Sequence, residues 1–220
     1  MLKNFQSRFI RFFLIVVMSL IMTALLAGPA TAETGARVLV FGDSLSAAYG
    51  IPSEQGWVAL LQQQLDRQAH RREVINASIS GETTSGGLTR LNQLLDQHRP
   101  ELVIIQLGAN DGLRGLPVSD MRRNLSAMIE LCQKSGARVA LIGIMIPPNY
   151  GPRYTLEFKE SYPLLAKKYK LPLVPFLLDG VTETPELMQD DGLHPKADAQ
   201  PMILQNVWKV LAPWFKSSAA

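Results

Sequence analysis

Cysteine is nearly absent from this sequence, whose single one among 220 residues is Cys132. One cysteine cannot form an intrachain disulfide, so the chain is not a small fold held together by disulfides. Cys132 recurs at helical spacing with Met121, Leu125, Met128 and Ile129. This stripe predicts that Cys132 fills a buried helix face and is not a nucleophile.

Histidine is almost as scarce, with three residues at positions 70, 98 and 194. None is accompanied by a cysteine pair or by a His-Glu-x-x-His arrangement, so the sequence offers a poor metal site. His70 lies in a polar helix tail and His98 precedes Arg99 and Pro100, which favours surface positions for both. His194 is the histidine that needs an explanation.

Long hydrophobic runs are missing after residue 32. Before it, Lys3, Arg8 and Arg11 precede apolar residues 12–27, and Ala30-Thr31-Ala32 is typical of a signal-peptide cleavage site. The alternative, an uncleaved membrane anchor, needs about 20 apolar residues, more than this run provides. We predict that residues 1–32 are a signal peptide, that residues 33–220 form one domain, and that the protein is exported to the periplasm or the medium.

An excess of charge is missing from that domain. The first 32 residues hold three basic residues and no acidic one; subtracting those three from the 22 Lys and Arg leaves 19, equal to the 19 Asp and Glu. The sequence pI of about 9.1 therefore reflects the leader. A neutral domain does not attract nucleic acid over long range, and we expect a soluble monomer that acts on a small molecule.

Short apolar runs alternate with stretches of helical period, which predicts an α/β fold. Five runs are expected to be buried parallel strands: residues 37–41, 73–77, 101–107, 138–144 and 171–176. Helical stripes run from Trp57 to Leu65, Leu88 to Leu95, Met121 to Cys132, Phe158 to Leu165 and Ile203 to Leu211. This alternation predicts a doubly wound three-layer α/β/α sandwich of the flavodoxin-like type.

Polar segments follow four of the predicted strands. They read GDSLSAAYG, SISGETT, GANDGLRG and, after an irregular stretch, QDDGLHP. Because ligands in open parallel sheets bind where the carboxyl ends of the strands meet, we expect these four segments on one rim.

These segments contain all the residue types that nucleophilic catalysis by a serine requires. A serine nucleophile needs a base, and the base needs an orienting carboxylate; Ser44, His194 and Asp191 supply all three. A serine in a Gly-Asp-Ser turn is by itself more often a turn or cap residue. Asp191 is three residues before His194 with Gly192 between, so a tight loop can return the carboxylate to the imidazole, whereas Asp190 is expected to be a turn or surface residue.

Donors for an oxyanion are also present. The backbone N–H groups of Ser44 and Gly81 and the side-chain amide of Asn110 are the candidates. Each has an ordinary interpretation as a turn or cap residue, but their joint appearance on one rim favours acyl transfer.

These residues resemble those of the SGNH-type (GDSL) hydrolases. Ser44, Gly81 and Asn110 match the family's serine, glycine and asparagine, and Asp191 and His194 match its final Asp-x-x-His. The segments NASISGETT, NDGLRG, PPNYGPRY and QDDGLHP are similar to the exported bacterial thioesterase I, lysophospholipase and arylesterase group over longer stretches. Ala109 departs from the glycine of a thioesterase in that group. No Gly-x-Ser-x-Gly elbow is present, which excludes an α/β-hydrolase.

The resemblance implies an exported, cofactor-free serine esterase that hydrolyses carboxylic esters and thioesters through an acyl-enzyme. We expect residues 145–154, with Tyr150, to form a wall that selects acyl chains. Two alternatives stay open: a carbohydrate O-deacetylase of the same family, and a flavodoxin-like module that binds a small ligand without turnover.

Overall fold

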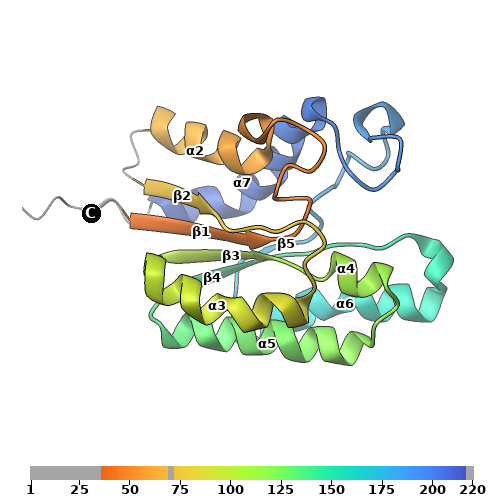
Figure 1. Cartoon of the computed structure of the whole chain (residues 1–220), viewed down its shortest axis with the longest axis horizontal. Helices are drawn as coiled ribbons and strands as arrows, with labels where there is room; N and C mark the ends of the chain where they lie inside the picture. Colours follow the sequence, from red (N-terminus) through yellow and green to blue (C-terminus); the bar gives the residue numbers. More distant parts are fainter. Residues whose placement is uncertain (1–35, 69–71, 217–220) are drawn as a thin grey trace, which may run out of the picture. The chain divides into compact units, whose positions relative to one another are not determined.

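The computed structural model describes residues 36–68 and 72–216 and contains a central parallel sheet (Figure 1). The sheet order is β2-β1-β3-β4-β5, with all neighbours parallel. The strands are β1 (Ala36–Gly42), β2 (Arg72–Asn76), β3 (Leu102–Gln106), β4 (Arg138–Ile142) and β5 (Leu173–Val174). The order confirms the predicted flavodoxin-like fold, in which the chain reverses its direction of sheet growth between β1 and β3.

The two edge strands differ from the prediction. β2 alternates between exposed and half-buried residues, because it has a neighbour on one side alone, and the prediction of a buried strand was wrong there. β5 has two residues in place of the expected six, since Pro172 and Pro175 flank it and a proline has no N–H to donate to a neighbouring strand.

Helices cover both faces of the sheet. α2 and α7 pack together on one face, and α3, α5 and α6 pack in sequence on the other (Figure 1). The helices are α2 (Trp57–Arg67), α3 (Thr84–His98), α4 (Ala109–Leu113), α5 (Val118–Lys134), α6 (Pro152–Tyr169) and α7 (Gln200–Lys216). Short 3₁₀ turns occur at Ser53–Gln55, Pro148–Tyr150, Pro185–Leu187 and Ala197–Ala199. The five predicted helical stripes are confirmed, and α4 is an addition that the sequence pattern did not predict.

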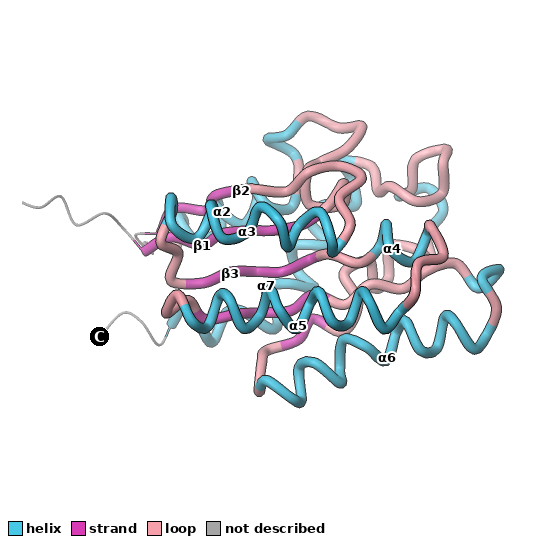
Figure 2. Tube along the Cα trace, turned by 60° about the horizontal axis from the view of Figure 1, so that its bottom comes forward, coloured by secondary structure: helices cyan, strands magenta, loops and turns pink. Residues whose placement is uncertain are grey.

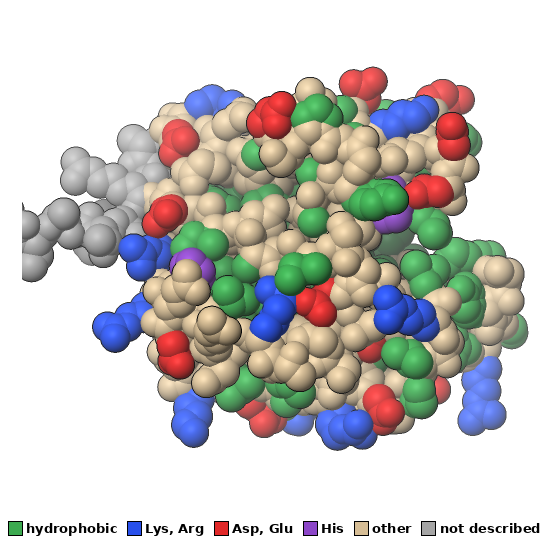
Figure 3. Space-filling view, viewed as in Figure 1, with side chains coloured by type: hydrophobic (Ala, Val, Ile, Leu, Met, Phe, Trp, Pro, Cys, Tyr) green, Lys and Arg blue, Asp and Glu red, His purple; other side chains and the backbone are tan. Residues whose placement is uncertain are grey.

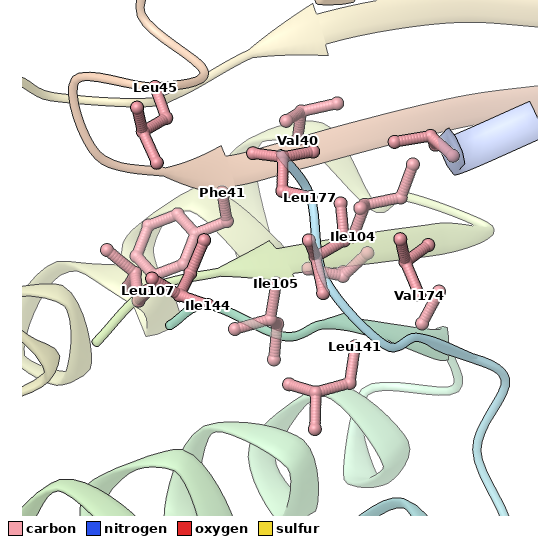
Figure 4. Packing of buried hydrophobic residues seen from close by; sticks show 14 of the residues in the cluster. Val40, Phe41, Leu45, Ile104, Ile105, Leu107, Leu141, Ile144, Val174 and Leu177 are labelled. Carbon is pink, nitrogen blue, oxygen red and sulfur yellow. The ribbon is translucent and has the colours of Figure 1, made fainter. Parts of the chain in front are cut away.

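The core lies between the sheet and these helices. Val40, Ile104 and Leu141, one from each of the three central strands, are fully buried and lie among buried loop residues such as Leu107 and Leu177 (Figure 4). Burying each such side chain contributes about 1.5–3 kcal/mol, so the central strands are firmly placed. Cys132 is buried on α5 as predicted, and burial raises the pKa of its thiol from 9.0 to about 12, which keeps the thiol protonated.

The loops that follow the strands gather at one end of the sheet, as the pink segments of Figure 2 show. This end carries all four polar segments that the sequence places after strands. No helix among the described residues is both long enough and apolar enough to cross a membrane.

Candidate active site

The turn after β1 is built to present Ser44. A Cβ at Gly42 would lie 2.7 Å from Gln106 Oε1, so only glycine fits at the end of the strand. Asp43 then folds the chain back: its Oδ1 accepts the Leu45 N–H at 3.1 Å, and its carbonyl accepts the Ser46 and Ala47 N–H groups. Asp43 and Ser46 are buried whereas Ser44 remains partly exposed. The serine therefore faces the rim from a rigid turn.

The loop before α7 places His194 beside that serine. Gly192 has φ of 65°, which permits the tight turn expected between the carboxylate and the imidazole. Asp191 Oδ1 accepts the N–H groups of Leu193 at 2.9 Å and His194 at 3.0 Å, and Asp191 Oδ2 lies 2.6 Å from His194 Nδ1. His194 Nε2 lies 2.9 Å from Ser44 Oγ. Three side chains from the two ends of the chain thus form one hydrogen-bonded line.

The carboxylate in this line is held ionised. Partial burial raises the pKa of Asp191, but hydrogen bonds from the His194 ring and from the backbone N–H groups of His194 and Leu193 outweigh it and lower the pKa from 3.8 to about 2. Asp190 is exposed and has no hydrogen-bond partner among the described residues. Of the two adjacent carboxylates, Asp191 is the one that reaches the imidazole.

The predicted oxyanion donors line the same cavity as the serine. Gly81 has φ of 79°, and its carbonyl accepts a 3.0 Å hydrogen bond from Arg114. The Asn110 amide donates one hydrogen bond of 3.0 Å to the Glu82 carbonyl, which leaves its second N–H for a ligand. Within the described part of the chain, the backbone N–H groups of Ser44 and Gly81 donate to no acceptor. All three predicted donors border the cavity beside the serine.

Sequence reasoning missed the buried groups that fix these segments relative to one another. Gln106, at the end of β3, donates to Asp43 Oδ1 at 3.0 Å and accepts the Ser46 hydroxyl at 2.6 Å. Asp111 accepts the Thr84 N–H at 2.8 Å and the Thr84 hydroxyl at 2.6 Å. The sequence does show signals for both residues. Gln106 is a polar residue at the end of an apolar run, and Asp111 is an acidic residue directly after Asn110.

Asp43 is the most unusual of these groups. It is fully buried, and its Oδ2 has no hydrogen-bond partner among the described residues. Burial raises its pKa from 3.8 to about 6, although the hydrogen bonds from Gln106 and Leu45 and the charge of His194 lower it. A carboxylate with this environment contributes an energetic cost whenever it is ionised.

A cavity of about 260 Å³ opens beside Ser44 and His194. Its lining is mostly apolar and comes from the segments after four strands: Leu45, Tyr49, Ala109, Leu113, Ile144, Met145, Ile146, Pro147, Leu178 and Leu193. In Figure 3, hydrophobic side chains gather around a hollow at the end of the sheet that carries the loops. The cavity suits an acyl chain bound next to Ser44.

Only the first part of residues 145–154 lies where the sequence analysis places it, and the prediction for Tyr150 was wrong. Met145, Ile146 and Pro147 line the cavity, but Tyr150 does not. The Tyr150 hydroxyl instead donates a 2.6 Å hydrogen bond to the Leu113 carbonyl, because the 3₁₀ turn at Pro148–Tyr150 directs the ring toward α4. Tyr150 therefore supports Leu113, which lines the cavity.

His98 takes no part in this arrangement. His98 is half-buried at the end of α3, not fully at the surface, and its carbonyl accepts a hydrogen bond from Arg37. His70 and the predicted signal peptide lie outside the described residues. Among residues 36–68 and 72–216, no three His, Cys, Asp or Glu side chains are grouped as ligands for a metal ion.

Comparison with known proteins agrees with this geometry. Residues 40–200 match the model of the GDSL-like lipase/acylhydrolase family. An arylesterase of Vibrio mimicus is 52% identical over 178 residues, which are 81% of this chain and 89% of that protein. The thioesterase 1/protease 1/lysophospholipase L1 of Escherichia coli (strain K12) is 43% identical over 176 residues, 80% of this chain and 83% of that protein.

A solved structure gives the same result. The crystal structure of the psychrotrophic esterase EstA from Pseudoalteromonas sp., inhibited by monoethylphosphonate, superposes with a TM-score of 0.78. It is 45% identical and covers 82% of this chain and 98% of that chain. The similarity therefore extends over nearly the whole of the described fold.

Proposed function

The chain belongs to the GDSL-like lipase/acylhydrolase family and hydrolyses ester bonds, and from that premise we propose that it forms an acyl-enzyme on Ser44. The observation that carries the proposal is the hydrogen-bonded line from Asp191 through His194 to Ser44, with distances of 2.6 and 2.9 Å. Each distance lies within the range over which a proton can be transferred.

The first half of the reaction forms the acyl-enzyme. Ser44 Oγ attacks the carbonyl carbon of the ester or thioester while His194 Nε2 accepts the hydroxyl proton. The tetrahedral intermediate collapses, the bond to the alcohol or thiol breaks, and His194 returns the proton to that leaving group. Asp191 stays ionised throughout, since its pKa is about 2, and it holds Nδ1 protonated so that Nε2 faces the serine.

The second half repeats these steps with water. His194 takes a proton from a water molecule, the resulting hydroxide attacks the acyl carbon, and Ser44 leaves with its proton restored. In both halves the negative oxygen is bound by the backbone N–H groups of Ser44 and Gly81 and by the Asn110 amide. Each such donor is worth about 10²–10³ in kcat in other acyl-transfer enzymes.

The lining of the cavity favours acyl substrates over acetylated sugars. Aliphatic side chains such as Ile144, Ile146 and Leu178 give a hydrocarbon chain more contact than an acetyl group can use. We therefore expect aryl esters, acyl thioesters and lysophospholipids to be better substrates than carbohydrate esters. Kinetics on matched p-nitrophenyl acyl esters and acetylated sugars decides between these classes: faster turnover of the acetylated sugar contradicts this order of preference.

Export is part of the same proposal and rests on the leader sequence alone. Cleavage after Ala32 leaves a chain that begins at Glu33. Intact-mass measurement of the protein recovered from the periplasm or medium tests this directly. A mature chain that retains residues 12–27 contradicts it.

Covalent labelling tests the site. A fluorophosphonate should label the parent stoichiometrically, and Ser44→Ala should abolish both labelling and ester hydrolysis. Ser80 borders the same cavity and provides the matched control, because Ser80→Ala should still be labelled if Ser44 is the nucleophile. Labelling that survives in Ser44→Ala contradicts the assignment.

A further inference from the structure

The aromatic ring of Tyr49 lies against the imidazole of His194. The ring centroids are 4.4 Å apart and the planes are inclined by 40°. Tyr49 is 51% exposed, so the ring is not part of the core. The His194 side chain beneath it is 18% exposed. The contact therefore covers one face of the imidazole.

The backbone around Tyr49 is held in an unusual conformation to make this contact. Ala48 has φ of 59° although it is not glycine, and Gly50 has φ of 75°. A left-handed conformation costs a residue that carries a Cβ free energy, so other interactions must maintain it.

Gln189 supplies those interactions. Its Nε2 donates to the Tyr49 carbonyl at 2.9 Å and to the Pro195 carbonyl at 3.0 Å, and its backbone N–H donates to the His194 carbonyl at 2.8 Å. A Cβ at Gly50 would lie 2.3 Å from Gln189 Oε1, which shows how closely the two loops approach. One side chain thus ties the tyrosine to the loop that carries the histidine.

The surroundings of the imidazole show what the ring can do. Asp191 binds Nδ1, Ser44 lies at Nε2, and the charge of buried Asp43 interacts with the ring. Tyr49 lies against a face of the ring, where none of these hydrogen bonds is made. When His194 accepts the proton of Ser44 it becomes a cation, and the face of an aromatic ring attracts a cation at this separation.

We propose that Tyr49 is a positioning residue that holds the His194 imidazole in line with Ser44 and stabilises its protonated form during acyl transfer. The proposal rests on the triad proposed above. The contact between the two rings is stronger when the imidazole carries a proton than when it is neutral. Tyr49 also lines the cavity beside Ser44, but a contact that strengthens when the imidazole is protonated acts mainly on kcat.

Steady-state kinetics on three purified variants tests this role. Tyr49→Leu should lower kcat about 5- to 30-fold at nearly unchanged KM, the range expected for loss of a partly desolvated cation–π contact. Tyr49→Phe keeps the ring and should stay within about twofold of the parent. Ile79→Ala is the matched control, because Ile79 is 49% exposed and has no ring contact with His194; it should retain parental kcat.

A spectroscopic measurement tests the contact without relying on turnover. The ring current of Tyr49 should shift the carbon-bound imidazole protons of His194 upfield in the parent and in Tyr49→Phe, and the shift should disappear in Tyr49→Leu. Circular dichroism confirms that each variant is folded.

Three results overturn the proposal: parental kcat in Tyr49→Leu, equal loss of kcat in Tyr49→Phe and Tyr49→Leu, or a change confined to KM, which would limit Tyr49 to its place in the cavity lining. Hydrolysis that survives Ser44→Ala in the same panel would overturn the triad itself and this role with it. An absent ring-current shift beside a Ser44-dependent enzyme would overturn the role of Tyr49 alone.

Discussion

Replacing Asp43, the buried carboxylate next to Ser44, should stabilise the protein relative to the parent by an amount that grows as the pH rises. Asp43 is fully buried and its pKa is raised from 3.8 to about 6 by desolvation. Below pH 3.8 the carboxyl is protonated in both folded and unfolded chains and has no effect on stability through ionisation. Between pH 3.8 and about 6 the folded chain keeps the proton that the unfolded chain loses, so the free energy of unfolding falls as the pH increases.

The size of this effect follows from the two pKa values. A rise from 3.8 to about 6 spans about two pH units, and each unit corresponds to about 1.4 kcal/mol. Ionised Asp43 should therefore lower the free energy of unfolding by about 3 kcal/mol above pH 6, compared with a protonated carboxyl.

Asp43→Asn removes this pH-dependent cost and keeps the shape of the side chain. Its Oδ1 can still accept from Leu45 and Gln106, but the new NH₂ group replaces an Oδ2 that has no partner among the described residues. An unpaired buried donor costs about 1–3 kcal/mol at every pH. The informative quantity is therefore the change with pH of the stability difference between variant and parent.

Urea unfolding followed by far-UV circular dichroism between pH 4 and pH 8 measures this quantity. The difference should move by about 2.5 kcal/mol in favour of Asp43→Asn across this range, because part of the effect of about 3 kcal/mol is already present at pH 4; most of the change falls between pH 4 and pH 6. Asp190→Asn is the matched control, since Asp190 is exposed and its difference from the parent should stay flat. A flat difference for Asp43→Asn, or one that moves in favour of the parent, refutes the argument.

The remaining predictions concern activity. Asn110→Ala should lower kcat about 10²–10³-fold in ester hydrolysis, because one donor to the negative oxygen is lost. Asp191→Asn should lower kcat by up to about 10⁴-fold, since the imidazole loses the group that fixes its tautomer, whereas Asp190→Asn should stay within about threefold because it takes no part in proton transfer. Met145→Ala should reduce kcat/KM for long p-nitrophenyl acyl esters about fivefold relative to the butyrate, because it removes apolar surface from the cavity. Tyr150→Phe should leave the chain-length profile unchanged, since it removes only a hydroxyl that donates to the Leu113 carbonyl, and Tyr150 does not line the cavity.

Circular dichroism shows whether each variant is folded, so that a loss of activity can be separated from a loss of structure. Near-parental kcat in Asn110→Ala removes that residue from the oxyanion site. An inactive Asp190→Asn beside an active Asp191→Asn would exchange the roles of the two carboxylates. A uniform loss across all chain lengths in Met145→Ala would argue against a role in chain selection.

The architecture was predictable because it depends on local patterns. Buried strands read as short apolar runs and helices as stripes of period 3.6, and both signals come from residues close together in the chain. The hydrogen bond between Asp191 and His194 was predictable for the same reason. The two residues are three apart in the chain, and a glycine with φ of 65° closes the turn between them. The proline-flanked β5 and the exposed β2 were mispredicted because strand length and burial also depend on which neighbours a strand has.

The site as a whole was decided by tertiary structure. Ser44 and His194 are 150 residues apart, and the sequence supplied their residue types and the rim they share but not the distance between them.

Contacts between segments could not be predicted from the sequence. Gln106 joins β3 to the turn that carries Ser44, and Tyr49, held by Gln189, lies against His194. Such contacts depend on sheet order and register, which bring segments within a few ångströms of one another. A pattern along the chain identifies the groups that can react, and packing across the sheet determines which of them meet.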